Sequence, residues 1–464
     1  MRLFTHCLLL ISVFAYSNAF IGAYQPIPVE DINGDPGKPL FLTPIIKSGQ
    51  IEQAQQLAAV NHTHFKGVDS YSGYLTVDEK TESHLFFWYF PAQTNADKAP
   101  VLLWLQGGPG ATSMFGLFGE HGPFEPKSKH GLKLRKYSWN LNHNMIYIDN
   151  PVGTGYSLTK NGYAKNETKV GADLYEALLQ FFQMFPKLQQ NEFFVSGESY
   201  AGKYVPAISY TIHKNNPSAA QKINFAGMAI GNGLSDPEHQ FKYGEYLYQL
   251  GIIDGAGRKL FQDAEAQAVS FIQKKEWLSA FQVFNRMLDA DLNQTSVFTN
   301  MTGFTNYYNF LVANDTNPKM AYMGKFIQNV ETRKAIHVGD SPFNGLGQDV
   351  EINLVEDIMQ SVAPWVIELL SHYPVLIYNG QLDIIVAYPL TVNYLNNLKF
   401  SAADEYKTAK RYVWRVDGEV AGFAKHAGNL TEVLVRNAGH MVPTDQPKWA
   451  FDLITRFTHR KSFV

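Results

Sequence analysis

Cysteine is nearly absent from the chain, since Cys7 is the single one among 464 residues. Disulfide scaffolds, zinc ribbons and thiol-based catalytic sites need more cysteines, or cysteines at other positions, so all three are excluded. Net charge is also small, because 39 Lys and Arg residues face 42 Asp and Glu residues and give a formal charge of −3. The basic surface of a nucleic-acid-binding protein is therefore not expected. Hydrophobic residues make up 45% of the chain, which excludes intrinsic disorder.

Long apolar runs are equally scarce. The one at residues 3–16 is too short to cross a bilayer comfortably. It follows the basic start Met1-Arg2 and precedes the small residues Ser17-Asn18-Ala19, a pattern that predicts a secretory signal peptide over residues 1–19. The alternative is a buried N-terminal helix. Cleavage after Ala19 would remove Cys7, and without a second run of spanning length we expect no membrane anchor.

Six Asn-X-Ser/Thr sequons support passage through the secretory pathway. Each match alone is weak because the pattern is common by chance. Six of them in a chain with a signal peptide predict a glycoprotein that is secreted or lysosomal, with each used site on the surface. The six residues are Asn61, Asn166, Asn293, Asn300, Asn314 and Asn429.

Short apolar runs that end in glycine- or aspartate-rich turns recur along the chain. Examples are residues 101–105 before Gly-Gly-Pro-Gly and residues 375–378 before Asn-Gly-Gln-Leu-Asp. Such runs predict strands buried on both faces, as in parallel sheets. Between them, as in residues 171–185, apolar residues recur at spacings of three and four and predict helices. This alternation predicts an α/β fold whose ligands bind at the carboxyl ends of the strands.

The alternation also suggests how the chain is divided. Residues 20–67, punctuated by Pro and Gly, are expected to form an extended arm or a pro-region. Residues 68–234 and 365–464 carry the strand rhythm and form two parts of one core. Residues 235–364 interrupt this rhythm with helical patches and an aromatic cluster. We interpret the segment as a helical cap inserted over the sheet, and the aromatic cluster as the core of that cap. The alternative is an independent second domain.

Ser199 is the candidate nucleophile. In residues 193–202, FFVSGESYAG, an apolar strand enters a sharp turn and a helix follows at once. This is the context of the nucleophile elbow in the α/β-hydrolase fold, whose pattern is Gly-X-Ser-X-Gly. Ala201 takes the last position and keeps it small. The alternative is a Ser that caps a helix.

Asp383 and His440 complete a candidate triad. Hydrolases of this fold place an acid and then a His after the Ser along the chain, and both residues follow predicted strands. Each alone fits a structural role equally well, but the ordered set favours catalysis. His440 would take the proton of Ser199 as the general base, and Asp383 would orient its imidazole. The backbone N–H groups of Gly108 and Tyr200 are the candidate oxyanion donors.

Five motifs, in this order, resemble those of the serine carboxypeptidase family: WLQGGPG, YIDNPVGTGYS, GESYAGKYVP, the Asp383 motif and AGHMVPTDQP. The phrases DPGKPLFLTP and GQLDIIVAYPLT are similar to the vitellogenic carboxypeptidase-like branch. The likeness extends from about Leu40 to the C-terminus. It implies an α/β-hydrolase fold with a helical cap and the release of single C-terminal amino acids from peptides. Many family members dimerise, so a homodimer is one expected state.

The resemblance also implies a site for the substrate's terminal carboxylate. By motif position it would consist of Gln106, the Gly107 amide, Glu120 and Glu198, and Met441 would line the pocket for the released residue. Two close carboxyls cannot easily both ionise, so at least one pKa should rise. A protonated Glu could then donate a hydrogen bond to the substrate. We therefore expect activity at acidic pH.

Two other functions fit parts of the pattern. An esterase or acyltransferase on the same fold would keep the triad but would not need the Glu pair. A catalytically silent secreted binding or storage protein would usually lack one of the triad residues. The sequence contains no HExxH motif and no cysteine-based ligand set, so we expect no metal and no cofactor. The expected partners are peptide or protein C-termini, without nucleic acid or membrane.

Overall fold

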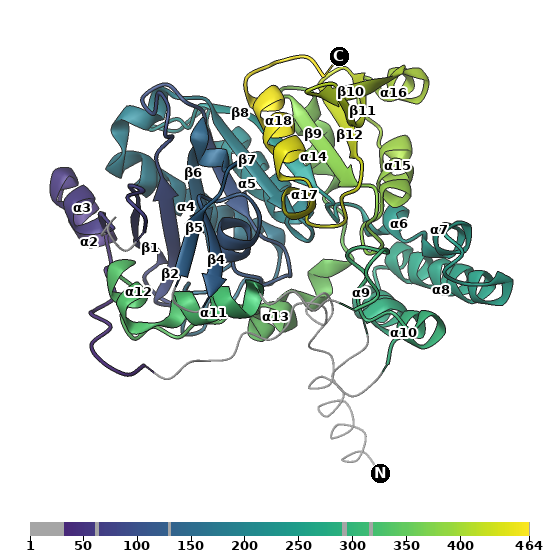
Figure 1. Cartoon of the computed structure of the whole chain (residues 1–464), viewed down its shortest axis with the longest axis horizontal. Coiled ribbons are helices and arrows are strands. Elements are labelled where there is room, and N and C mark those ends of the chain that lie inside the picture. The colour runs from purple at the N-terminus through teal and green to yellow at the C-terminus, as the bar shows by residue number, and fades with distance from the viewer. Residues whose placement is uncertain (1–31, 61–64, 129–130, 290–294, 315–318, 464) are drawn as a thin grey trace, which may run out of the picture.

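A large mixed sheet forms the centre of the molecule (Figure 1). The computed structural model describes residues 32–60, 65–128, 131–289, 295–314 and 319–463. Within these ranges ten strands form the sheet in the order β1-β2-β6-β3-β7-β8-β9-β12-β11-β10, and β4 pairs with β5 in a separate hairpin. The strands are β1 Tyr71–Asp78, β2 Ser83–Phe90, β3 Val101–Leu105, β4 Phe124–Ser128, β5 Gly131–Leu134, β6 Asn144–Ile148, β7 Phe193–Glu198, β8 Phe225–Gly231, β9 Val375–Gly380, β10 Arg411–Val416, β11 Glu419–Ala427 and β12 Leu430–Val435.

The middle of the sheet is parallel and its edges are antiparallel. The neighbours β6, β3, β7, β8, β9 and β12 all run in the same direction. Strands β1 and β2 extend one edge in antiparallel fashion, and β11 and β10 extend the other. The sequence-based prediction of an α/β fold with a mostly parallel sheet is confirmed.

Helices cover both faces of the sheet because its central strands are apolar on both sides. Phe193 packs its ring against Phe182 on one face, and the next residue, Phe194, packs against Phe457 on the other. Successive side chains of a strand point to opposite faces, so α4 and α18 lie on opposite sides of β7. The helices of this core are α4 Glu167–Met184, α5 Ala201–Asn215, α14 Ala363–Leu370, α15 Tyr388–Asn397, α16 Ala403–Thr408, α17 Val442–Asp445 and α18 Pro447–Thr458.

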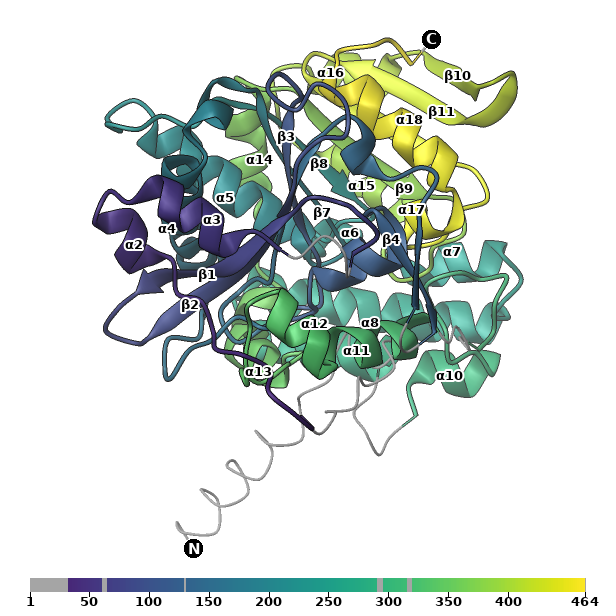
Figure 2. The same cartoon turned by 60° about the vertical axis from the view of Figure 1, so that its left-hand side comes forward.

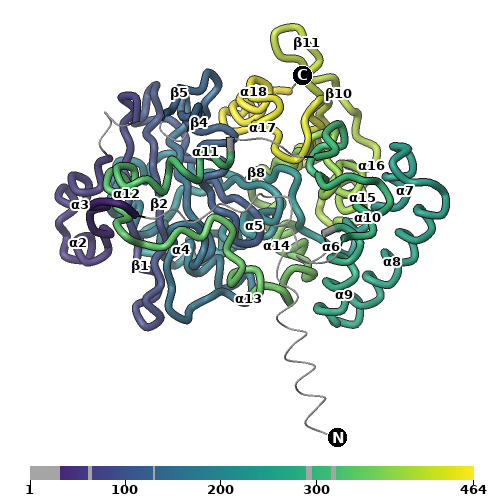
Figure 3. The backbone as a smooth tube through the Cα atoms, turned by 60° about the horizontal axis from the view of Figure 1, so that its bottom comes forward, coloured from purple at the N-terminus to yellow at the C-terminus, as the bar shows by residue number. Residues whose placement is uncertain are grey.

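In the residues that the structure describes, the chain between β8 and β9 consists of helices joined by irregular segments and contains no strand of the sheet. Figures 1 and 3 show that α7–α10 gather at one side of the molecule, whereas α11–α13 run beneath the sheet toward β1 and β2. Figure 2 shows α11 and α12 next to each other below the strands. The helices are α6 Pro237–Gln240, α7 Tyr243–Gln249, α8 Gly255–Gln273, α9 Trp277–Phe284, α10 Val297–Thr302, α11 Lys319–Gln328, α12 Val330–Ala335 and α13 Gln348–Ile358.

The segment before β1 is partly helical, although we expected an extended arm or a pro-region. Helices α2 (Thr43–Lys47) and α3 (Ile51–Ala58) pack against α4 and β1. The buried Thr43 hydroxyl donates to Gln180 of α4 and accepts from the Thr76 amide of β1. Because these bonds join three elements, residues 43–58 belong to the folded body. The predicted signal peptide and Cys7 lie outside the described residues, within which no helix is long and apolar enough to cross a bilayer.

Candidate active site

The sharp turn predicted at the candidate nucleophile Ser199 is present between β7 and α5, and we call it the elbow. The φ of Ser199 is 65°, in the left-handed region that side chains rarely adopt. Such backbone strain costs on the order of 1–3 kcal/mol and persists where the surrounding structure enforces it. Here the Ser199 amide donates to Gly231 O at 3.1 Å, and its carbonyl accepts from the amides of Gly202 and Leu234. The elbow is thereby fixed to the end of β8.

Small residues around the elbow are required by close backbone contacts. A Cβ on Gly197 would lie 2.6 Å from Leu105 O, and one on Gly202 would lie 2.6 Å from Leu234 N. Both distances are shorter than real Cβ contacts, so a larger residue would push β7 away from β3, or α5 away from the loop after β8. Ala201, in the last position of the motif, is fully buried.

The glycine loop after β3 lies directly against the elbow. A Cβ on Gly107 would be 2.5 Å from Tyr200 N and 2.8 Å from the Ser199 Cβ. Gly108 has a φ of 110°, a conformation that favours glycine. The two amides that we expect to stabilise an oxyanion, those of Gly108 and Tyr200, therefore belong to segments in direct contact.

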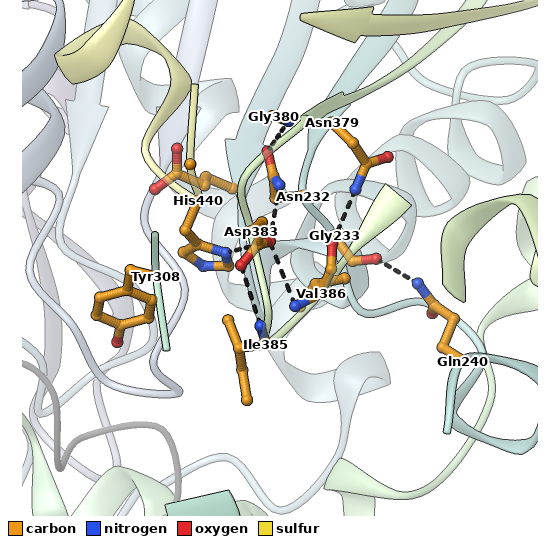
Figure 4. Close-up of polar contacts among 12 residues, drawn as sticks. Asn232, Gly233, Gln240, Tyr308, Asn379, Gly380, Asp383, Ile385, Val386 and His440 are labelled. Atoms are coloured by element: carbon orange, nitrogen blue, oxygen red, sulfur yellow. Dashed lines mark hydrogen bonds and ion pairs between the residues drawn. The ribbon is translucent and has the colours of Figure 1, made fainter. Parts of the chain in front are cut away.

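His440 and Asp383 lie beside each other, as Figure 4 shows. The His440 Nδ1 is 2.9 Å from Asp383 Oδ2, and both side chains are completely buried. With Nδ1 donating to the carboxylate, Nε2 carries the lone pair that a general base needs. That Nε2 is buried and makes no hydrogen bond with any described residue, Ser199 included. Hydrogen bonds of this kind are often longer before substrate binds.

The Asp383 side chain accepts hydrogen bonds from residues of several segments. Oδ2 accepts from Asn232 Nδ2 at 2.7 Å and from the Val386 amide at 3.3 Å, and Oδ1 accepts from the Ile385 amide at 3.1 Å (Figure 4). Asn232 also accepts from the Gly380 amide at 3.1 Å, so it joins the ends of β8 and β9. Sequence reasoning missed this role of Asn232. Its signal was the Gly-Asn-Gly turn directly after β8.

Gln106, at the end of β3, bonds to Glu198, at the end of β7. Gln106 Nε2 donates to Glu198 Oε1 at 3.0 Å, while Gln106 Oε1 accepts from Trp104 Nε1 at 3.0 Å. The Trp104 bond fixes which end of the amide points at Glu198. All three side chains are buried.

Glu120 brings a second buried carboxyl to the same place. It closes the short π-helical turn η1 (Gly116–Glu120) and is 1% exposed. Burial raises the pKa of Glu120 to about 7, although interactions with Glu198, Gln106 and His440 oppose the rise. Both Glu120 oxygens nevertheless lack a hydrogen bond of ordinary geometry with a described residue, as does Glu198 Oε2. Burial, followed by the charge of Glu120, raises the pKa of Glu198 well above its usual value. The pair is therefore largely protonated in acid.

The remaining residues predicted from the sequence are Met441 and the sequon asparagines. Met441 is half-buried, directly after His440 and before α17. Asn166, Asn300, Asn314 and Asn429 are exposed, whereas Asn61 and Asn293 lie outside the described residues. Among the described residues there is no group of three or more His, Cys, Asp or Glu that could hold a metal ion.

Comparison with known proteins places this arrangement in a family. Residues 61–460 match the model of the family described as serine carboxypeptidase. The chain is 55% identical to the venom serine carboxypeptidase of Apis mellifera, covering 95% of this chain and 94% of that one. It is 52% identical to the vitellogenic carboxypeptidase of Aedes aegypti, covering 92% and 91% of the two chains. Against the probable serine carboxypeptidase CPVL of Homo sapiens it is 49% identical, covering 93% and 91%.

The fold has a solved counterpart. It is similar to the prohormone-processing carboxypeptidase Kex1(delta)p of Saccharomyces cerevisiae, with a TM-score of 0.75 and 22% sequence identity over 88% of this chain and 96% of that one. The sheet order, the elbow and the family match agree with one another. The chain belongs to the serine carboxypeptidase family and is a serine-type carboxypeptidase with an α/β-hydrolase fold.

Proposed function

We propose that this enzyme releases single C-terminal amino acids from peptides through a Ser199-His440-Asp383 acyl-enzyme mechanism that works best in acid. One observation carries the proposal. Beside the elbow, Gln106, Glu198 and Glu120 form a buried polar group in which three carboxyl oxygens make no hydrogen bond of ordinary geometry with a described residue. Buried polar atoms without partners are rare in proteins, and a ligand that supplies acceptors for protonated carboxyls would satisfy them.

The catalytic steps follow from the positions of the donors and acceptors. Ser199 Oγ attacks the carbonyl carbon of the last peptide bond while His440 Nε2 takes its proton. The C–N bond then breaks, and the same proton moves from His440 to the leaving amine. A water molecule attacks the resulting ester, again with His440 as base, and restores Ser199. Asp383 orients the His440 imidazole, and its own oxygens accept from four donors.

The tetrahedral intermediates need fixed donors for the negative oxygen. Support for Gly108 and Tyr200 in this role comes from the contact between the glycine loop and the elbow. Tyr200 also stands directly before the first turn of α5, where the helix dipole favours negative charge.

The pH dependence follows from the carboxyl pair. A protonated Glu120 or Glu198 donates to the substrate carboxylate, whereas an ionised one repels it. Because the pKa of Glu120 is about 7, kcat/KM should fall as the pH rises through neutrality. The Gln106 amide and the Gly107 N–H add donors that do not titrate. The acidic working range therefore originates in substrate binding.

The remaining features of the proposal concern the context of the enzyme. We assign residues 1–19 to a signal peptide, residues 235–364 to a cap, and residues 68–234 and 365–464 to the core. Met441 would line the pocket for the released residue. Secretion or lysosomal delivery, glycosylation and a homodimer are part of the same proposal. Exposure of four sequon asparagines is compatible with glycosylation.

The test is digestion of a defined peptide, followed by mass spectrometry, between pH 4 and pH 8. The expected result is the stepwise loss of one residue at a time from the C-terminus, faster at pH 5 than at pH 8 and abolished in Ser199→Ala. Internal cleavage, or unchanged digestion by Ser199→Ala, would contradict the proposal. A flat pH profile would remove the role of the carboxyl pair.

A further inference from the structure

A tyrosine of the insertion lies against the proposed catalytic histidine. The Tyr308 ring stacks on the His440 imidazole with centroids 4.9 Å apart and an interplanar angle of 18°. Figure 4 shows the two rings facing each other, with Asp383 on the far side of the imidazole. Both side chains are buried, at 4% and 1% exposure. The sequence pattern suggested that the aromatic cluster at residues 304–311 belongs to the core of the cap. Tyr308 instead contacts the site.

Backbone hydrogen bonds fasten the same segment to both catalytic loops. The His440 amide donates to Tyr308 O at 2.7 Å. The Ile384 amide, next to Asp383, donates to Tyr307 O at 3.1 Å. Two consecutive carbonyls of the insertion thus hold the histidine loop and the aspartate loop. The Phe310 amide returns a bond to Leu382 O at 3.0 Å.

Residues 305–313 can act as a fixed support because hydrogen bonds join the two ends of this loop. The amides of Thr305 and Asn306 both donate to Ala313 O, at 3.0 and 3.1 Å. The buried Asn306 side chain donates to Val312 O at 3.0 Å and accepts from the Tyr308 amide at 2.9 Å. The Tyr308 backbone is therefore held by its own loop as well as by the bond from the His440 amide.

The residue before the histidine fits this support closely. A Cβ on Gly439 would lie 2.3 Å from Tyr308 O and 2.9 Å from the Asn309 Cβ. The Gly439 amide and the Asn309 side chain both donate to Asp445 Oδ2, at 2.7 and 3.2 Å. Only a glycine allows the histidine loop to approach the insertion so closely.

We propose that Tyr308 is a positioning residue for the reaction, whose ring fixes the plane of the His440 imidazole while residues 305–313 fix its backbone. An imidazole held at Nδ1 by Asp383 could still tilt about that bond, and the stacked ring restricts the tilt. His440 Nε2 is then kept oriented toward Ser199. Misplacement of a catalytic group by about 1 Å can cost on the order of 100-fold in rate. The inference rests on the proposed triad mechanism.

The test measures the rate at which a fluorophosphonate labels Ser199, a reaction that needs the triad but no peptide. Tyr308→Leu removes the stacked ring, and we expect the labelling rate and kcat for a peptide to fall by at least ~10-fold, with KM changed less. Tyr308→Phe keeps the ring and should restore both rates to within about threefold of the parent. Leu311→Ala, at a residue of the same loop that is 69% exposed, is the matched control and should change neither.

Each outcome decides a different point. Equal labelling of the parent and Tyr308→Leu proteins would overturn the role of Tyr308 while leaving the triad intact. Equal losses in Tyr308→Phe and Tyr308→Leu would overturn the role of the ring. If the parent protein is not labelled at Ser199, the triad mechanism fails and the role of Tyr308 fails with it. Labelling without release of C-terminal residues would contradict the proposed function alone. If the Tyr308→Leu protein fails to fold, the Tyr308→Phe protein decides. Its His440 ring-proton resonance should match that of the parent, and a shifted resonance would count against the role of the ring.

Discussion

Replacement of Glu120 by Gln should weaken the pH dependence of stability. Glu120 is buried, and its pKa rises from an ordinary 4.5 to about 7 in the folded protein. The native state therefore holds a proton that the unfolded chain releases between these values. The stability that this proton provides is complete below about pH 4.5 and is lost as the pH rises through about 7. The shift corresponds to a loss of at most about 3 kcal/mol in the free energy of unfolding.

Gln has nearly the same shape as a protonated Glu and cannot ionise. The Glu120→Gln protein should therefore lose up to about 3 kcal/mol less stability than the parent between pH 4.5 and pH 8. Glu198 remains in both proteins, and removal of its charged neighbour can only reduce its own contribution to that loss. At pH 5 the variant should bind peptides nearly as well as the parent, since Gln still offers an N–H donor.

The assay is denaturant unfolding at several pH values, with Glu52→Gln as the matched control. Glu52 lies exposed on α3, so its replacement makes the same change in formal charge without a buried carboxyl. The control should follow the pH dependence of the parent. If Glu120→Gln also followed it, Glu120 would not be the group that holds the proton, and the reasoning on the carboxyl pair would be refuted.

Three further predictions concern the supports of the site. Gly439→Ala should lower kcat/KM by at least ~10-fold, because its Cβ would meet Tyr308 O at 2.3 Å. The control Gly255→Ala should have no effect, since a Cβ on Gly255 meets nothing within 4 Å. Parent-like kinetics for both variants would count against the contact between Gly439 and Tyr308. In Asn232→Asp, the new Asp can adopt the φ of 42° but places an oxygen where the 2.7 Å donor to Asp383 was. The kcat measured on a peptide should therefore fall at least ~10-fold. An unchanged kcat would show that the bond is dispensable. Dithiothreitol should leave the activity intact, because the described residues contain no cysteine, and loss of activity in a reductant titration would oppose this.

The central strands could be predicted because their apolar runs are continuous. Residues 101–105 form β3 without a change of bounds, and the run at residues 375–378 is extended by two residues to form β9. The sequence did not reveal β10 and β11, whose exposed and charged residues interrupt the apolar pattern. Nor did it reveal the β4–β5 hairpin, in which Leu132 alone of the second strand is buried. These strands depend on their neighbours more than on their own composition.

In the candidate site, too, some residues could be predicted from local motifs and others could not. Ser199, Asp383 and His440 stand at the ends of strands, so local motifs were enough to select them. The bond between Asn232 and Asp383 joins residues 151 positions apart, and the Gly-Asn-Gly turn alone does not show that Asn232 contacts Asp383. Tyr308 sits in an irregular segment with no sheet rhythm, and its contact with His440 depends on how the insertion folds back. Such supports become visible only in three dimensions.

The most direct test of the account compares a peptide that ends in a free carboxylate with the same peptide ending in a C-terminal amide. At pH 5 Glu120, Glu198 and Gln106 should each donate to the free carboxylate, and the loss of two of these three charge-assisted hydrogen bonds would cost about 3 kcal/mol or more. We therefore expect kcat/KM for release of the last residue to be at least ~100-fold higher for the free acid. Equal turnover of the two peptides would contradict the central claim that Gln106, Glu120 and Glu198 recognise the end of a peptide chain.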